Sequence, residues 1–181
     1  MTIDLDNLST MGTTENISVQ NIWSILQEVC DPEVPVLSVI DLGIVRDVKI
    51  NNTGDAHEIE VVITPTYSGC PAMDVIRMNI RMVLLEYGYK NVQITTILSP
   101  AWTTDWMTDA GKEKLKTYGI APPNPKQQVC NTQLFAEDEA VQCPHCNSYN
   151  TRRISEFGST ACKSLWQCND CHEPFDYFKC Y

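Results

Sequence analysis

Two Cys-x-x-Cys motifs near the C-terminus constrain the fold more than any other feature of this sequence. They are separated by 21 residues (147–167), and their cysteines are Cys143, Cys146, Cys168 and Cys171. Each motif supplies two thiolates from one tight turn, and zinc prefers four soft ligands at the corners of a tetrahedron. A segment of about forty residues seldom folds on its own core without such a staple. The spacing therefore predicts a small zinc ribbon over residues 142–181, with these four thiolates as structural zinc ligands.

The same segment contains two histidines and two further cysteines. Because four thiolates already close a zinc site, we interpret His145 and His172 as exposed neighbours of the motifs. Cys162 and Cys180 flank the later strands of the ribbon, and they are candidates for a second cluster of soft ligands. The alternative is that both are small buried side chains. The predicted ribbon strands are 152–157, 163–167 and 175–179.

The preceding hundred or so residues alternate between helix and strand signals. Apolar residues recur at helical spacing after Ser18, a suitable N-cap, until Pro32 ends the pattern. The predicted elements are a helix over 18–31, strands over 44–50 and 58–64 with a turn at 51–54, a helix over 71–87, a strand over 92–98 and a helix over 102–118. The helical crossover before the third strand makes it parallel to the second. We predict an α+β fold, a two-layer α-β-β-α-β-α domain with a small mixed sheet, followed by the zinc ribbon.

Composition divides the chain into four parts. Residues 1–17 are polar and predict a flexible tail. The domain over 18–120 follows, and a proline-rich stretch then opens a linker over 121–141. The ribbon over 142–181 is electrically neutral, so the net charge of −10 lies in the rest of the chain.

This charge excludes some classes of partner. An acidic chain does not offer the basic surface that free nucleic acid needs. The sequence shows neither the pattern of a targeting signal nor an apolar run of membrane-spanning length. We therefore expect a cytoplasmic protein that binds neither nucleic acid nor membrane. Because cytosolic thiols stay reduced, nine cysteines favour metal binding or thiol reactivity over disulfides.

One cysteine outside the ribbon, Cys70, lies between a glycine and a proline after a β-branched run. We predict that it begins the second helix, where free N–H groups and the helix dipole stabilise a thiolate and lower the pKa. Local chemistry leaves three roles open: a nucleophile, a metal ligand or a small buried residue. Three acids before the first strand either face Cys70 or cap turns, namely Asp31, Glu33 and Asp41.

Motifs within residues 18–181 resemble a known family. Three of them are similar to the iron–sulfur assembly domain of SufT-like and cytosolic iron–sulfur targeting proteins, namely DPEVP (31–35), DLGIV (41–45) and TPTYSGCP (64–71). Three more narrow the resemblance to the PaaD (PaaJ) family, namely WTTDWM (102–107), FGSTACK (157–163) and EPFDYFKC (173–180). Members of that family are accessory subunits of the bacterial phenylacetyl-CoA epoxidase system.

The resemblance implies a non-catalytic accessory subunit of the ring 1,2-epoxidase in aerobic phenylacetate degradation. Its role would be iron–sulfur or iron cofactor maturation, and its partner would be the oxygenase or the flavin/iron–sulfur reductase. Cys70 would be the cluster-transfer or ligand cysteine, with Glu33 and Asp41 nearby, and would carry a transient iron ion or iron–sulfur cluster. The ribbon cysteines would hold zinc or iron. Two alternatives stay open: a structural adaptor of the multicomponent oxygenase, and a thiol-dependent enzyme that uses Cys70.

Overall fold

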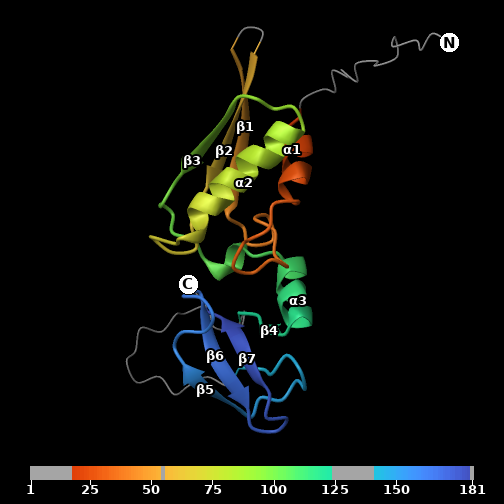
Figure 1. Ribbon diagram of the computed structural model, residues 1–181, viewed down its shortest axis with the longest axis vertical. Helices are drawn as coiled ribbons and strands as arrows, with labels where there is room; N and C mark the ends of the chain where they lie inside the picture. The colour runs from red at the N-terminus through yellow and green to blue at the C-terminus, as the bar shows by residue number, and fades with distance from the viewer. Residues whose placement is uncertain (1–17, 54–55, 124–140, 180–181) are drawn as a thin grey trace, which may run out of the picture.

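The computed structural model describes residues 18–53, 56–123 and 141–179 (Figure 1). The predicted tail at 1–17, most of the predicted linker at 121–141, and Cys180 lie outside the described residues. The molecule is elongated, with the C-terminal ribbon at one end and the β1–β2 hairpin at the other. No helix in the described ranges is long and apolar enough to cross a membrane.

The first unit is a three-stranded mixed sheet covered by helices. Its elements are α1 (Val19–Leu26), β1 (Val45–Thr53), β2 (Ala56–Ile63), α2 (Ala72–Glu86), β3 (Val92–Thr96), a 3-10 turn η1 (Thr104–Trp106) and α3 (Asp109–Tyr118). The strand order is β1-β2-β3, with β1 antiparallel and β3 parallel to β2. Helices α1 and α2 lie on one face of this sheet (Figure 1). The predicted α+β class and the parallel third strand are therefore confirmed.

The core of this unit follows from the alternation of side chains in β2 and the spacing of apolar residues in α2. Ile59, Val61 and Ile63 alternate along β2 and are at most 1% exposed. Ile76 and Ile80 are one helical turn apart in α2 and fully buried. These side chains belong to one apolar cluster. Because burial of this cluster fixes β2 against α2, it also fixes both ends of the loop between them, which carries Cys70.

Three of the differences from the predicted elements concern α1, the first hairpin and the helix over 102–118. Helix α1 ends at Leu26, well before Asp31, because the following amides bond three residues back and the Asp31 amide then donates to the Leu37 carbonyl. The Asp31 carboxylate accepts hydrogen bonds from the Glu33 and Val34 amides and organises the next turn. The predicted hairpin turn at 51–54 starts too early, since β1 runs to Thr53.

The third difference is an interruption of the predicted helix over 102–118. The Trp102 indole donates to the Leu42 carbonyl at 2.8 Å and is buried. The Thr108 hydroxyl accepts from the Gly111 amide at 2.9 Å and caps the start of α3. Burial of a tryptophan against the loop before β1 therefore outweighs continuation of the helix. The predicted end of this helix, before Gly119 with φ 90°, is confirmed.

The ribbon is a small sheet with the strand order β4-β7-β6-β5. Its strands are β5 (Thr151–Ser155), β6 (Lys163–Cys168) and β7 (Pro174–Phe178), which match the three predicted strands, and β4 (Ile120–Ala121). Sequence reasoning missed β4, which comes from the end of the first unit and pairs with β7 in parallel. A strand of two residues has no periodicity to detect, so only the tertiary structure shows it.

The ribbon packs directly against the first unit. Phe178 at the end of β7 is 1% exposed and belongs to the apolar cluster of the first unit. Its ring lies 6.3 Å from the Trp102 ring in an edge-to-face arrangement. Cys162, just before β6, is 5% exposed and belongs to the same cluster. Phe175 and Tyr177 instead pack into a separate core within the ribbon.

Candidate metal sites

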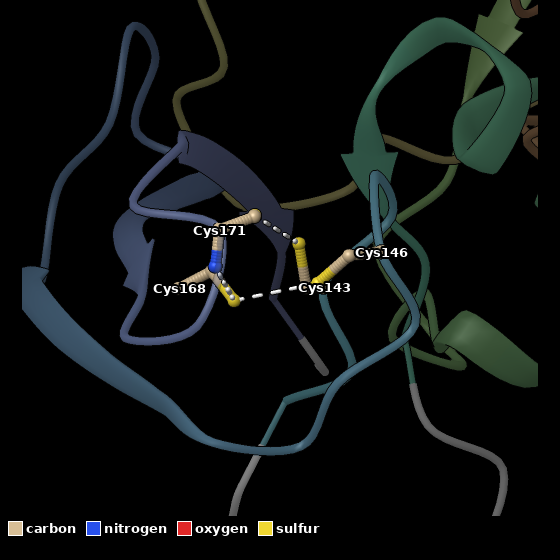
Figure 2. A group of neighbouring side chains, drawn as sticks. All are labelled: Cys143, Cys146, Cys168 and Cys171. Carbon is tan, nitrogen blue, oxygen red and sulfur yellow. Dashed lines mark hydrogen bonds between the residues drawn. The ribbon is translucent and has the colours of Figure 1, made fainter.

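The four cysteines of the two predicted knuckles converge on one point (Figure 2). Their sulfur atoms all lie within 4.8 Å of one another. The Cys143 and Cys171 sulfurs are 3.8 Å apart, and the Cys146 and Cys168 sulfurs are 3.5 Å apart. A tetrahedron with Zn–S bonds of about 2.3 Å has edges of about 3.8 Å. The four residues therefore fit a closed, four-thiolate metal site.

Backbone conformation in each knuckle aims the two thiols at this point. Asn147 and His172, the residues that follow the second cysteine of each motif, have φ of 61° and 64°. The left-handed conformation turns the chain back towards its own metal ligands, and asparagine adopts it at low cost. The His172 and His145 side chains are exposed, as predicted for neighbours of the site. The Asp170 carboxylate accepts hydrogen bonds from Ser148 and Asn150 and so joins the two knuckles.

The knuckle thiols do not have equal proton affinities. The backbone N–H groups of Cys171 and Asp170 stabilise the Cys168 thiolate and lower its pKa to about 7. The Cys171 N–H lies 3.5 Å from that sulfur. Burial raises the pKa of Cys143, which is fully enclosed. A metal ion that displaces these protons would supply the positive charge that offsets the repulsion among four closely packed thiolates.

Cys70 lies just before α2, as the sequence predicted. Gly69 has a φ of 88°, which favours glycine, and Pro71 occupies the N-cap position of the helix. The Cys70 amide donates to the Tyr67 carbonyl at 3.2 Å. This turn directs the half-buried thiol toward the apolar cluster of the first unit, against which it packs.

The predicted direction of the Cys70 pKa is wrong. Burial raises this pKa, and the Glu33 and Asp31 carboxylates raise it further. The Ala72 N–H at the helix start and the Tyr67 hydroxyl act in the opposite direction but do not outweigh burial. The helix N-terminus is present as predicted, but desolvation and like charge dominate. The surroundings of Cys70 therefore favour the thiol over the thiolate.

The three predicted acids separate into two groups. Glu33 and Asp31 lie within electrostatic range of Cys70, as their effect on its pKa shows. Asp31 is 8% exposed, and burial raises the pKa of its carboxyl.

Asp41 belongs to a different network. Its carboxylate accepts hydrogen bonds from the Ser38 amide, the Thr108 hydroxyl and Lys114, the last at 2.6 Å. Burial opposes ionisation of Asp41, but the bonds from Lys114 and Ser38 outweigh it and hold its pKa below the ordinary value. Asp41 therefore ties the loop before β1 to α3.

Cys162 lies beside the acids of the first unit. Its sulfur is 3.7 Å from a Glu33 carboxylate oxygen and 3.0 Å from the Thr160 hydroxyl. Burial and the Glu33 charge raise its pKa to about 11. The sequence placed Cys162 with Cys180, which lies outside the described residues. Nothing in the sequence paired it with Glu33, because 129 positions separate the two residues.

Comparisons with known proteins agree with this architecture. Residues 19–95 match the family described as iron-sulfur cluster assembly protein, and residues 127–179 match the family described as PaaD zinc beta ribbon domain. These two matches and the geometry above define the class: an iron–sulfur cluster assembly domain joined to a zinc beta ribbon carrying a four-cysteine metal-binding group.

The full-length similarity is more specific. The chain is 46% identical over 170 residues to an Escherichia coli protein named as the D component of a "Putative 1,2-phenylacetyl-CoA epoxidase", an alignment that covers 94% of this chain and 98% of the relative. The chain belongs to this family of phenylacetyl-CoA epoxidase D components.

Two further proteins are similar to about half of the chain. The chain is 35% identical over 91 residues to an Fe-S protein maturation auxiliary factor of Porphyromonas gingivalis, covering 50% of this chain and 83% of the relative. A crystal structure of a DUF59 domain from Bacillus anthracis is 23% identical, with a TM-score of 0.47, and covers 53% of this chain and 89% of that chain.

Proposed function

We propose that this protein matures the iron or iron–sulfur cofactor of another component of a phenylacetyl-CoA epoxidase system. Membership of the D-component family supports an accessory role, and similarity to an Fe-S maturation factor supports cofactor maturation as that role. The partner is the oxygenase or the flavin/iron–sulfur reductase. The observation that carries the proposal is the environment of Cys70, a half-buried soft ligand of the assembly domain within electrostatic range of Glu33 and Asp31.

Cys70 suits the binding of a passing metal better than catalysis by a nucleophilic thiolate. A catalytic cysteine needs a lowered pKa, whereas burial and two carboxylates raise the pKa of Cys70. A metal ion displaces the thiol proton, so its charge offsets the two carboxylates. Once the metal leaves, the thiol regains the proton. Such reversible binding suits a residue that transfers a metal to a partner. It argues against the alternative that the protein is a thiol-dependent enzyme.

The ribbon serves as a structural metal site in this proposal. Four thiolates close the coordination sphere, and zinc is the ion that prefers this arrangement in small ribbons. All the described cysteines are free thiols, which suits the reducing cytoplasm. Metal and sulfide analysis of anaerobically purified protein tests this assignment. We expect about one zinc per chain and no sulfide, whereas iron with sulfide would contradict the assignment.

A structural adaptor is the second candidate, because α2 presents an exposed apolar stripe. Its members are Val75, Met78, Met82 and Leu85, which are 40%, 53%, 51% and 54% exposed. They recur at spacings of three and four residues and therefore share one helix face. Exposed methionines are common on surfaces that bind partner helices. An adaptor would depend on this stripe and not on Cys70.

The experiment that separates the two functions measures partner binding and partner iron content independently. Cys70→Ser replaces a soft ligand by a hard, poorly ionised hydroxyl of similar size. We expect the variant to fold and keep its partner, while the oxygenase or reductase co-expressed with it contains less iron. Cys30→Ser, which changes an exposed thiol on the same domain, is the matched control. Normal iron content with Cys70→Ser would favour the adaptor.

A further inference from the structure

Helix α2 has two opposite faces, one buried and one exposed. The buried face packs on the sheet beside α1 (Figure 1), and its members are at most 5% exposed, namely Met73, Ile76, Ile80 and Leu84. The opposite face carries the apolar stripe, whose members are Val75, Met78, Met82 and Leu85. Because its buried face already holds α2 on the sheet, the stripe is a preformed helical surface that faces solvent.

The stripe has the spacing of a coiled-coil seam. Its members follow one another at intervals of three, four and three residues, which are the a and d positions of two consecutive heptads. Val75 and Met82 occupy the a positions, and Met78 and Leu85 occupy the d positions. In parallel coiled coils, a β-branched residue at a with leucine at d favours two strands. The spacing therefore suits the docking of one further helix.

The charges that flank the stripe complement those of a second, identical helix. In the same heptad frame, Arg81 is a g position, and Glu86 is the e position of the following heptad. Both are exposed, and neither forms a salt bridge within the part of the chain that the structure describes. In a parallel pair these two positions lie beside each other, so Arg81 of each copy meets Glu86 of the other. In an antiparallel pair g lies beside g, and the two Arg81 side chains would repel each other.

We propose that a second copy of this chain docks on the apolar stripe, with the two α2 helices packed in parallel about a two-fold axis. The interface is isologous, so each Arg81–Glu86 pair occurs twice. Cys70 lies just before α2, so the parallel direction places both Cys70 residues at the same end of the dimer. The proposal goes beyond the maturation function, because it gives the assembly domain a two-fold arrangement.

The length of the seam indicates how strong the dimer is. Helix α2 has 15 residues, and the stripe supplies two a/d layers from each heptad frame and one flanking ion pair on each side. A contact of this kind is smaller than the interfaces of obligate dimers. We therefore expect a reversible dimer that dissociates on dilution.

Sedimentation equilibrium of the full chain over a range of concentrations tests this proposal. We expect a monomer–dimer equilibrium that Met82→Asp abolishes. Ile154→Asp is the matched control, because Ile154 is an apolar residue of β5 that is 49% exposed, and it should change nothing. Arg81→Glu and Glu86→Arg should each raise the dissociation constant about tenfold or more, because symmetry doubles the lost pair and brings like charges together. The two changes combined in one chain should restore the wild-type constant.

A disulfide experiment tests the direction of the helices. In the parallel pair Met78 lies opposite Met78 of the second copy, so Met78→Cys should form a disulfide-linked dimer in oxidised glutathione. In the antiparallel pair Met78 lies opposite Met82, so only a chain with cysteine at both positions would be linked. Ile154→Cys should not form such a dimer. Mass spectrometry of the linked peptides identifies the bond, since the chain has nine other thiols.

A chain that stays monomeric at every concentration would overturn the proposal, as would a dimer that Arg81→Glu and Met82→Asp leave intact. If the chain is monomeric and Met82→Asp instead loses the co-expressed oxygenase or reductase, the stripe binds that component and the second copy is wrong. If an aspartate variant fails to fold, the Met78→Cys experiment still decides, because cysteine is a small apolar replacement. The maturation function is tested separately by Cys70→Ser, which leaves the stripe unchanged.

Discussion

Phe178→Ala should separate the ribbon from the assembly domain without unfolding either. Phe178 is 1% exposed, packs in the cluster of the first unit and lies edge to face with Trp102 at 6.3 Å. Truncation of a buried phenylalanine costs about 3–5 kcal/mol, of which the aromatic pair contributes about 0.5–1.5 kcal/mol. The ribbon core around Phe175 and Tyr177 is a separate cluster and stays intact.

The loss of docking free energy in Phe178→Ala can be measured as the alkylation rate of Cys162. Each 1.4 kcal/mol is about a tenfold change, so the population of undocked protein should rise by about two to three and a half powers of ten. Cys162 is 5% exposed in the docked state and becomes accessible only when the ribbon moves away. Its alkylation rate by iodoacetamide, measured by mass spectrometry under native conditions, should therefore rise by a similar factor. The zinc content should not change.

Phe157→Ala is the matched control, because it removes the same atoms from an exposed position of the same ribbon. Phe157 is 65% exposed, and its ring contacts the Lys179 ammonium at 4.7 Å. Loss of an exposed cation–π contact costs about 0.5–1 kcal/mol and should leave Cys162 protected. Equal alkylation rates in the two variants would refute the docking argument, as would loss of zinc from Phe178→Ala.

Three further predictions concern the metal and the titrating groups. Removal of the metal, or Cys143→Ser, should unfold the ribbon, because structural zinc contributes on the order of 10 kcal/mol to folding. Proteolysis after chelation should then leave a fragment of roughly residues 18–120. A ribbon that resists proteolysis without metal would contradict the zinc assignment. The alkylation rate of Cys70 should have a pH midpoint above that of an ordinary thiol, since burial and nearby negative charge raise its pKa. Glu33→Gln should lower this midpoint. A wild-type midpoint below the ordinary value would show that the helix N-terminus dominates. The lowered pKa of Asp41 stabilises the fold above its ordinary value of 3.8, and this stabilisation disappears as the pH falls through the lower folded value. Lys114→Met should therefore move acid unfolding to higher pH, whereas Lys112→Met, which breaks a 3.8 Å pair with the fully exposed Asp109, should not.

Much of the architecture was accessible from sequence because its signals are local. The Cys-x-x-Cys spacing sets a tight turn in each knuckle, and the four thiols meet as the spacing predicted. The crossover from β2 through α2 to β3 predicted a parallel pair, which the sheet contains. Capping also depends on neighbouring residues only, so Ser18 was recognised as the N-cap of α1.

Features that depend on burial or on distant partners were not accessible. The helix over 102–118 was predicted as continuous, because nothing local shows that Trp102 packs under the loop at Leu42. The direction of the Cys70 pKa was wrong for the same reason: the helix N-terminus is a local feature, whereas desolvation and the charges of Glu33 and Asp31 arise from folding.

The sequence by itself determined the four-cysteine metal site of the ribbon and the position of Cys70 before a helix. Only the tertiary structure decided that β4 joins the ribbon sheet and that Phe178 packs in the other unit's core. It also placed Cys162 beside Glu33, a residue 129 positions away. The physical reason is the range of the forces involved. Turns and caps are set by neighbouring residues, whereas apolar burial depends on surfaces that meet after the chain has folded.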